Sequence, residues 1–515
     1  MNDRNISVSF VLLLGYNASQ QNLIYPSGRE PGHNYYALNT ATQDGHDTFE
    51  ALFNFLADNY STEKIHVDNW ILGNEVNVHK TWNYSGINDI NANANAYADA
   101  FKLLSDAVKS HSQSSRVFVS VDHCWNETAG GNQFSTKSFL DAFNNAIKAK
   151  QADIQWGIAF HAYPADLRYC DIWSSTWSAN TTDNESTQFI TCKNIDVLTN
   201  YVKTHYGPDT RIILSEQGFN AYNGDSIQAA ALAYSYYKSE FNDMIDAFII
   251  RSDKDYQSEI SQGLKFGLTD INGNKRQSYN VFKYMDTDQY PIYTNFALNI
   301  IGTSDWSYLV SNFDSRLFLA NSPNNPYYSS VYNTDWYLSH NPDLYNKYKS
   351  NPKAALIHFI QCGMKEGREA SSNFNVKLYR QKYPDLNTAF GNNWEKYFEH
   401  YLNIGISEGR TANSITDNTD TDNTDTDKPD TNKPDTNKPD TDKPDTNKPD
   451  TNKPDTDKPD TDKPDTNNTT NTPSDNTPNK TYDNSAIKIQ ILLLSASVVL
   501  LLNYIYKKHS STKNN

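Results

Sequence analysis

The chain has 515 residues, of which 37% are hydrophobic and 13% aromatic, and it carries a net charge of −16 at pH 7. This length is enough for two or three domains with a large core. Much of the acidity belongs to residues 414–484, which hold 18 Asp and 9 Lys, so it says little about a ligand of the remaining chain. No basic cluster with interleaved aromatic residues occurs, and we therefore do not expect nucleic acid as a partner.

The four cysteines are too few for a disulfide scaffold. Cys170 and Cys192 flank one loop, where they would be able to pair in a secreted protein, whereas Cys124 and Cys362 are expected to be lone thiols. No Cys-x-x-Cys or His-x-x-x-His spacing suggests a metal site. We expect neither a metal nor a cofactor.

The first 285 residues alternate between short apolar runs and segments with helical spacing of apolar residues. The apolar runs predict strands at 8–14, 69–75, 117–121, 154–160, 211–216 and 245–250. Helices are expected around 48–56, 97–108, 139–147, 195–206 and 226–241, with Ser226 as an N-cap, and in a last segment that ends near Met285. Strands that alternate with helices in this way imply a parallel sheet.

Six strands are two short of a closed barrel, and the first expected strand lies at the very start of the chain. Residues 1–15 do not resemble a signal peptide, because charges of both signs precede a short apolar run without a small-residue cleavage site. We therefore expect an α/β fold over residues 1–318, a (β/α)8 TIM barrel lacking its first two strands as given, with the missing pair before Met1. An open doubly-wound sheet is the alternative, although no Gly-rich phosphate loop supports it.

Polar residues follow the expected strands at the end where such a sheet holds its active site. They are Asn17, Glu75, His123, His161, Glu216 and Arg251. Glu75 and Glu216 end two similar runs, NWILGNE and RIILSE, where a carboxylate is poorly placed for packing and well placed to line a pocket. For either Glu alone, a surface ion pair is the plainer explanation. Their equivalent positions favour a shared site.

Two Glu residues that converge on one barrel face suit glycoside hydrolysis, in which one protonates the leaving oxygen and the other attacks the anomeric carbon. A retaining enzyme needs the two carboxyl groups about 5–5.5 Å apart. Strands four and seven of a closed barrel face each other across it. If two strands are missing, Glu75 and Glu216 lie on those two strands.

The Asn74-Glu75 pair at the end of a fourth strand and Glu216 at the end of a seventh resemble the clan-A "4/7" retaining glycoside hydrolases. That resemblance implies Glu75 as the general acid/base and Glu216 as the nucleophile. It implies that Asn74 donates a hydrogen bond to the sugar 2-hydroxyl, that Tyr163 touches the nucleophile, and that His161 lines the pocket.

A wider pattern, over residues 6–315, resembles still more closely an uncharacterised bacterial family of hydrolase-like barrels. It consists of GNEVN, the Asp122-His123 pair with Trp125, HAYPADL and SEQGF. The chain departs from the clan in two ways. Because the first and second strands are missing, a polar residue that the clan often supplies from strand two to orient the nucleophile cannot be located. The last strand ends in Arg251-Ser252-Asp253, where the clan usually offers an aromatic sugar platform.

The tryptophans divide by position. Trp70 and Trp156 lie within expected strands and should belong to the core, whereas Trp125, Trp173 and Trp177 lie in loops and are expected to stack on sugar. The predicted substrate-binding residues are Asn17, Asn74, His123, Trp125, His161, Tyr163 and Trp173.

A tandem repeat with a period of 42 residues spans 326–413. The segment NPDL at Asn341 recurs as YPDL at Tyr383, and His358 recurs as His400. The first unit predicts helices at 336–345 and 354–363, with a structural role for the shared His. Units this small normally stack. We expect the module to bind a cell-wall or glycan ligand, or to act as a spacer.

Residues 416–481 contain no aromatic or aliphatic side chain, so 414–486 are expected to form a disordered Thr/Asp/Lys/Pro-rich stalk. The apolar run at 489–506, followed by Lys507 and Lys508, predicts a transmembrane helix over 487–506 with a cytoplasmic tail at 507–515. The expected location is the cell membrane, with a single pass and the catalytic domain outside.

Three interpretations follow. The first is a surface-tethered retaining glycoside hydrolase that acts on extracellular polysaccharide or oligosaccharide. The second is a non-catalytic surface adhesin, whose barrel binds glycan and whose repeats bind cell wall or a partner. A binding barrel has no need of two facing carboxylates, which favours the first. The third is a fragment that is incomplete as given and unable to fold.

Overall fold

The computed structural model of this protein describes residues 6–62, 64–319, 327–349 and 351–413. The predicted stalk at 414–486, the predicted transmembrane helix at 487–506 and the tail at 507–515 lie outside these residues. Among the helices that are described, none combines the length and the apolar character needed to cross a bilayer.

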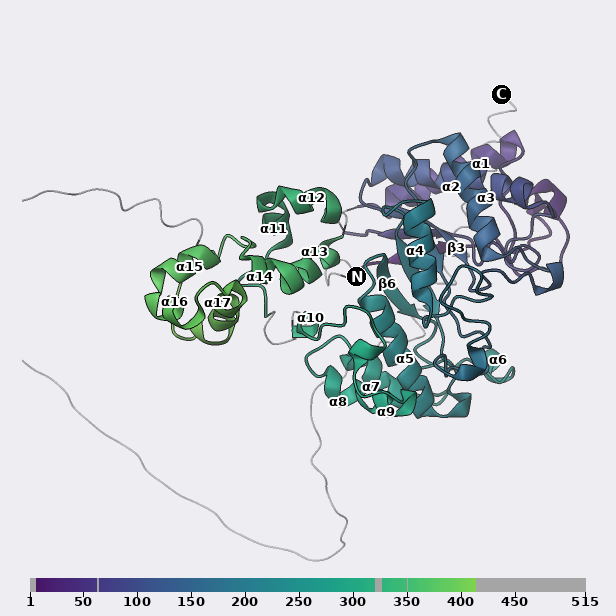
Figure 1. The fold of residues 1–515 in the computed structure, drawn as a ribbon. Coiled ribbons are helices and arrows are strands. Elements are labelled where there is room, and N and C mark those ends of the chain that lie inside the picture. Colours follow the sequence, from purple (N-terminus) through teal and green to yellow (C-terminus); the bar gives the residue numbers. More distant parts are fainter. Residues whose placement is uncertain (1–5, 63, 320–326, 350, 414–515) are drawn as a thin grey trace, which may run out of the picture. The chain divides into compact units, whose positions relative to one another are not determined.

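Six strands form one parallel sheet in the described part of the chain (Figure 1). They are β1 (Ser9–Leu12), β2 (Asn69–Leu72), β3 (Arg116–Val121), β4 (Gly157–Phe160), β5 (Ile212–Gln217) and β6 (Ile245–Ile250). Each strand pairs in parallel with the next one along the chain. This unbroken order is that of a partial (β/α) barrel, because a doubly-wound sheet reverses its strand order at a switch point. The doubly-wound alternative is therefore excluded.

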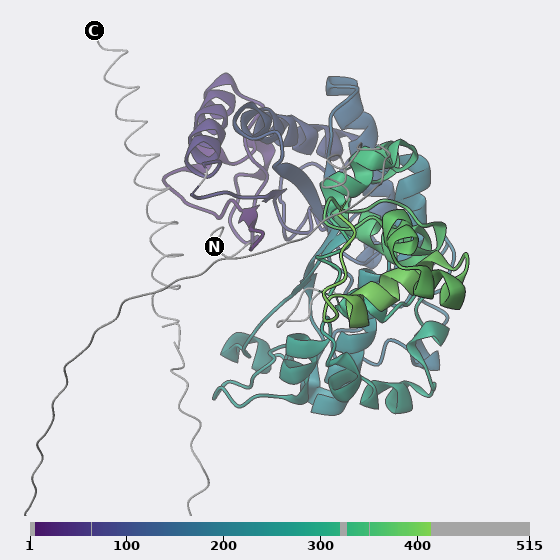
Figure 2. The same ribbon diagram turned by 90° about the vertical axis from the view of Figure 1, so that its left-hand side faces the viewer.

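Helices connect successive strands and lie on the outside of the sheet (Figures 1 and 2). They are α1 (Gln43–Asn59), α2 (Ile90–His111), α3 (Thr136–Lys150), α4 (Ile195–His205) and α5 (Asp225–Glu240), followed after β6 by α6 (Gln257–Ile260), α7 (Gln277–Tyr284), α8 (Tyr290–Thr294), α9 (Phe296–Ile301) and α10 (Arg316–Leu319). Side chains of Thr42, Asp89 and Ser135 cap the first three. The predicted N-cap at Ser226 was wrong: Gly224, with φ of 122°, precedes α5, and Ser226 lies in its first turn.

The inner face of the sheet is filled by one residue from each of five neighbouring strands. These are Ile71, Phe118, Ala159 and Ile213, with Ala247 packed against them. A Cβ atom at Gly157 would lie 2.5 Å from the Phe118 ring, so only glycine leaves room for that ring. Trp70 and Trp156 are buried, which confirms that both belong to the core. A packed interior fixes the strand ends relative to one another.

The two edge strands, β1 and β6, do not pair with each other within the described residues. β2, β3 and β4 are almost wholly buried, whereas β1 and β6 are mostly half-buried. Val11 and Leu13 are exposed on the β1 side. The sheet is therefore an open part of a barrel rather than a closed one.

Residues 327–413, without 350, form two small helical units. The helices are α11 (Thr334–His340), α12 (Pro342–Tyr348), α13 (Pro352–His358) and α14 (Met364–Glu366), and then α15 (Val376–Lys382), α16 (Pro384–Phe390) and α17 (Trp394–His400). The single helix predicted at 336–345 is in fact two, because Pro342 begins a new helix. Both α13 and α17 continue into a π-helical turn, over Phe359–Gly363 and Tyr401–Gly405.

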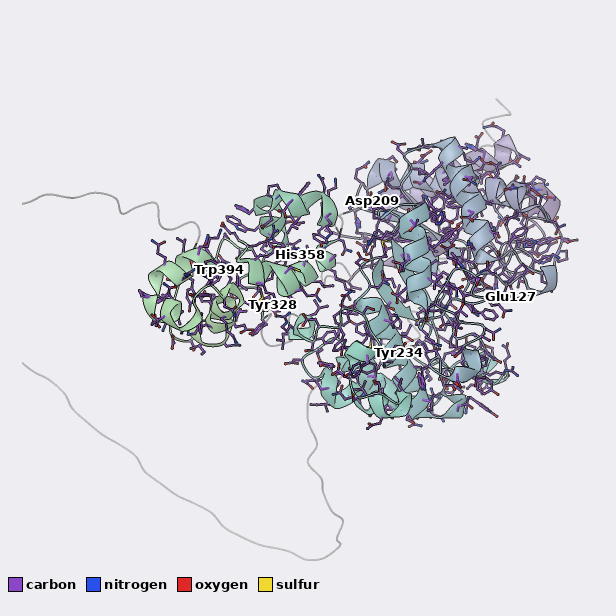
Figure 3. The ribbon with its side chains drawn as sticks, viewed as in Figure 1. Glu127, Asp209, Tyr234, Tyr328, His358 and Trp394 are labelled. Atoms are coloured by element: carbon purple, nitrogen blue, oxygen red, sulfur yellow. The ribbon has the colours of Figure 1, made fainter. Side chains whose placement is uncertain are left out.

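The same hydrogen bond recurs in these units at a spacing of 42 residues. Tyr337 Oη lies 2.9 Å from Nδ1 of His358, which is labelled in Figure 3, and Tyr379 Oη lies 3.0 Å from His400 Nδ1. Both histidines therefore have the structural role predicted from the sequence. The division into domains and the ligand of this module stay predictions.

Candidate active site

β2 ends at Leu72, and a tight turn carries Glu75 to the end of the sheet. Gly73 and Glu75 both have positive φ, 79° and 40°, and a positive φ is uncommon for a residue other than glycine. Ser120 of β3 holds the turn: its hydroxyl accepts the N–H of Glu75 at 3.0 Å, and its carbonyl accepts that of Val76 at 2.9 Å. The strand is shorter than predicted, and Glu75 belongs to a strained turn of the kind that clusters at functional sites.

Glu216 lies within β5, and two neighbours hold its carboxylate. The hydroxyl of Tyr163 donates to Glu216 Oε1 at 2.6 Å, and Arg251 Nε lies 3.1 Å from the same oxygen. Tyr163 follows β4 and Arg251 follows β6, so both strands that flank β5 contribute. Within the described residues, Glu216 Oε2 has no hydrogen-bond partner.

The end of β4 joins the two carboxylates. His161 Nδ1 lies 2.9 Å from Glu75 Oε1, and the ring centres of His161 and Tyr163 are 6.3 Å apart. Each Glu therefore makes a hydrogen bond to one of two adjacent rings. The fold thus brings Glu75, His161, Tyr163, Glu216 and Arg251 into one cluster, although they come from four strand ends.

The surroundings set the protonation of both rings. Burial alone lowers the pKa of His161, but its hydrogen bond with Glu75 and the charges of Glu75 and Glu216 outweigh burial, so the pKa of His161 is raised. Burial and the charge of Glu216 raise the pKa of Tyr163 well above its usual range. Tyr163 is therefore a neutral hydrogen-bond donor at physiological pH, and His161 is suited to donate its Nδ1 proton to Glu75.

The cluster is open to solvent. The side chains of Glu75 and Glu216 are 16% and 30% exposed. Two small apolar cavities lie elsewhere, one lined by residues such as Leu12 and Tyr97, the other by residues such as Leu232, and neither is lined by Glu75 or Glu216. The candidate site therefore lies at the carboxyl ends of the strands, with its two carboxylates partly exposed to solvent.

His123 lies at the margin of the cluster. Its ring centre is 6.4 Å from that of Tyr163, and Phe189 stacks on it at 5.4 Å. Burial lowers the pKa of His123, so the ring stays neutral, and its Nδ1 has no hydrogen-bond partner in the described part of the chain.

The adjacent Asp122, His123 and Cys124 place three potential ligand atoms close together. However, Asp122 Oδ1 already accepts hydrogen bonds from Asn77 and Thr136, at 2.7 and 2.8 Å. Burial, together with the charge of Asp122, raises the pKa of the Cys124 thiol far above its usual range. These groups therefore support the loop after β3.

Trp125 is fully buried, with 0% exposure. Its Nε1 donates to the carbonyl of Glu185 at 3.2 Å, and its ring packs on Tyr201 at 5.1 Å. The prediction that it stacks on sugar was wrong, because residues of the long loop after β4 cover it. A position in a loop does not by itself imply exposure.

Three other predicted binding residues have different surroundings. Asn74, next to Glu75, is half-buried, and its side chain makes no hydrogen bond to another described residue. Asn17 is exposed and accepts hydrogen bonds from the N–H and hydroxyl of Ser19, at 2.9 and 2.8 Å, so it stabilises its own turn. Trp173 is half-buried, and no contact in the described residues joins it to the cluster. Of the three, only Asn74 is placed beside a carboxylate.

Cys170 and Cys192, at the ends of the long loop, are free and buried. Cys170 Sγ donates to the carbonyl of Asn220 at 3.2 Å, and Cys192 Sγ lies 3.7 Å from that of Ala162. Burial raises the pKa of both thiols to about 12. The loop is thus closed by hydrogen bonds, without the disulfide considered from the sequence.

Sequence reasoning missed two residues that contact members of the cluster, one through the backbone of Glu75 and the other through Arg251. Ser120 is a lone polar residue in the apolar run VFVSV, and that exception was a usable signal. Glu259 pairs with Arg251 at 2.9 Å, and nothing in the local sequence indicates this contact.

The family model described as "Family of unknown function (DUF5722)" matches residues 1–309. No curated protein matches the sequence. Among solved structures, a family 39 glycoside hydrolase from Bacteroides cellulosilyticus is 17% identical, with a TM-score of 0.38, and 55% of this chain and 51% of that chain are covered. A GH39 β-xylosidase from Caulobacter crescentus is 13% identical, with a TM-score of 0.34 and coverages of 55% and 54%. The chain spans about half the length of these structures.

Proposed function

Because the chain belongs to the DUF5722 family, whose function is unknown, its activity has to be inferred from its site, and we propose that it is a retaining glycoside hydrolase. Its substrate is an extracellular polysaccharide or oligosaccharide. One observation carries the proposal: His161 and Tyr163, from the same strand end, bind Glu75 and Glu216 at 2.9 and 2.6 Å. Two carboxylates that are hydrogen-bonded to adjacent rings suit catalysis at one glycosidic bond that lies between them.

The orientation of each carboxylate supports these roles. In both Glu75 and Glu216, Oε1 is bound by the protein, and Oε2 has no hydrogen-bond partner among the described residues. Glu216 Oε2 attacks the anomeric carbon, and the bond to the leaving oxygen breaks as Glu75 Oε2 gives that oxygen its proton. Glu75 then takes a proton from water, which attacks the same carbon and releases Glu216.

The neighbours hold this chemistry in place. Tyr163 stays neutral and keeps Glu216 Oε1 turned away from the sugar. Glu75 alternates between general acid and general base, and the hydrogen bond from His161 partly offsets its negative charge when it is ionised. Asn74 donates to the sugar 2-hydroxyl, and His123 lies where a further hydroxyl would bind.

A mechanism-based label tests the proposal. We expect a 2,4-dinitrophenyl 2-deoxy-2-fluoro glycoside, from a panel of gluco, xylo, galacto and manno forms, to add one fluoroglycosyl group to the peptide that contains Glu216. Glu216→Gln should remain unlabelled. Glu75→Ala should regain turnover of activated substrates with azide, because azide needs no general base.

Asp166→Asn is the matched control. Asp166 is a partly exposed carboxylate in the loop after β4, paired with Arg168, and nothing joins it to the cluster. The Asp166→Asn variant should be labelled at Glu216 to the same extent as the wild type. Labelling at another residue, or full activity in Glu216→Gln, overturns the assigned roles. Glycan binding by the wild type without labelling or turnover favours the adhesin.

The C-terminal part of the proposal rests on sequence alone. Residues 487–506 anchor the chain in the cell membrane, the stalk at 414–486 holds the catalytic domain outside, and the repeats at 326–413 bind cell wall or glycan. Protease treatment of intact cells should release the catalytic domain. A chain that survives this treatment intact contradicts the topology.

A further inference from the structure

Arg251 occupies an unusual place beside the proposed nucleophile. Its N–H donates to the carbonyl of Gln217 at 2.7 Å, which sets the residue next to the end of β5. Its Nε lies 3.1 Å from Glu216 Oε1, and its Nη2 lies 2.9 Å from Glu259 Oε1. One guanidinium therefore joins a strand-end carboxylate to a carboxylate on α6.

The segment that carries Glu259 is firmly attached to the barrel. Arg276 Nη2 donates to Asp255 Oδ2 at 2.6 Å, and the N–H of Gly267 donates to Asp255 Oδ1 at 2.9 Å. Asp255 is only 2% exposed. This buried pair fixes the loop between β6 and α7, and with it the position of Glu259 against Arg251.

Four other groups contribute charge or a hydrogen bond near Glu216. Tyr163 is neutral, His161 is shared with Glu75, and Glu75 and Glu259 are acidic. Burial lowers the pKa of Arg251, but the charges of Glu216 and Glu259 outweigh burial, so its pKa is raised. Arg251 is the permanent cation in contact with Glu216, and two carboxylates already balance it. A third carboxylate at this position, such as that of an acidic sugar, would be poorly accommodated.

We propose that Arg251, held by Glu259, is the positioning residue for the nucleophile Glu216. This inference rests on the proposed function. Together with Tyr163, Arg251 binds Oε1 and leaves Oε2 free to attack.

The test measures two quantities in the full chain: the maximal rate constant for fluoroglycoside labelling of Glu216, and the reagent concentration that gives half of that rate. In Arg251→Gln we expect the rate constant to fall about tenfold with the half-saturating concentration unchanged, because Glu216 Oε1 is then held by Tyr163 alone and the carboxylate is less well oriented. Arg251→Lys keeps a charged donor and should recover part of the rate. Glu259→Gln should lower the rate constant by a smaller factor.

Arg116→Gln is the control for loss of an ion-paired arginine. The Arg116 side chain is 36% exposed and that of Arg251 is 38% exposed, and Arg116 pairs with Asp246 near the opposite ends of the strands. The labelling rate constant and half-saturating concentration of Arg116→Gln should match those of the wild type. Thermal unfolding of every variant separates a misfolded chain from a mispositioned carboxylate.

The outcomes are distinct. If the wild type is labelled at Glu216 and the labelling of Arg251→Gln equals that of Arg116→Gln, the inference is overturned. The proposed function is then left intact. Equal labelling rate constants in Arg251→Lys and Arg251→Gln also overturn it, because a charged donor at this position then has no part. A wild-type chain labelled by no member of the panel overturns the proposed function and this inference with it.

Discussion

Replacing Tyr163 by Phe removes one hydroxyl from the cluster and leaves the ring in place. The Tyr163–Glu216 hydrogen bond is 2.6 Å long and the side chain of Glu216 is 30% exposed. A hydrogen bond to a charged group contributes about 1.5–3 kcal/mol, and water at a partly exposed carboxylate recovers part of that. We take the lower end, about 1.5 kcal/mol, which corresponds to roughly a tenfold loss in kcat/KM.

The assay is kcat/KM on an activated aryl glycoside across the pH range. The alkaline limb should not move on account of Tyr163, since burial and the charge of Glu216 raise its pKa well above its usual range.

Tyr201→Phe provides the matched control. Tyr201 is also buried and donates to a carboxylate, Asp141, at 2.8 Å, but it lies on α4. Its loss should lower stability and leave kcat/KM unchanged. The reasoning is refuted if Tyr163→Phe shows the same activity and pH profile as Tyr201→Phe.

Two further changes test the electrostatics of the fold. In Glu75→Gln the pKa of His161 should fall, because burial then acts without the opposing carboxylate; an unchanged NMR titration of the His161 ring contradicts this. Arg276→Met should lower the free energy of unfolding by about 3–5 kcal/mol, because it leaves Asp255 buried and unpaired. Arg168→Met, at a 71% exposed side chain, should change it by less than about 0.5 kcal/mol, and equal melting temperatures for the two variants would rule the argument out.

Local sequence patterns predicted the elements well. Apolar runs of strand length and the spacing at Tyr97 and Phe101 depend on neighbours a few residues away, and the structure has β2, β3, β5 and α2 in these places. The predicted helix boundaries were wrong where a single residue determines where a helix begins or ends. Pro342 divides a helix, and Gly224 rather than Ser226 precedes α5.

Burial in loops could not be predicted in the same way. Trp125 and Trp173 both lie outside strands and helices, but only Trp125 is covered completely, by residues that follow it by about 60 positions. Asn17 satisfies its hydrogen bonds within its own turn. The burial of a loop side chain depends on which other loop folds over it, and the periodicity of apolar residues along the chain does not predict this.

The sequence by itself determined that two carboxylates follow parallel strands, because strand, turn and helix are set by residues close together along the chain. The resemblance to a known clan also implied the contact of Tyr163 with Glu216, but only the tertiary structure decided that His161 and Arg251 meet those carboxylates. His161, Tyr163 and Arg251 contact Glu75 and Glu216 because consecutive strands pair in parallel around a packed interior. The register and curvature that bring Glu75 and His161, 86 positions apart in the sequence, to a contact of 2.9 Å arise from the packing of the whole sheet.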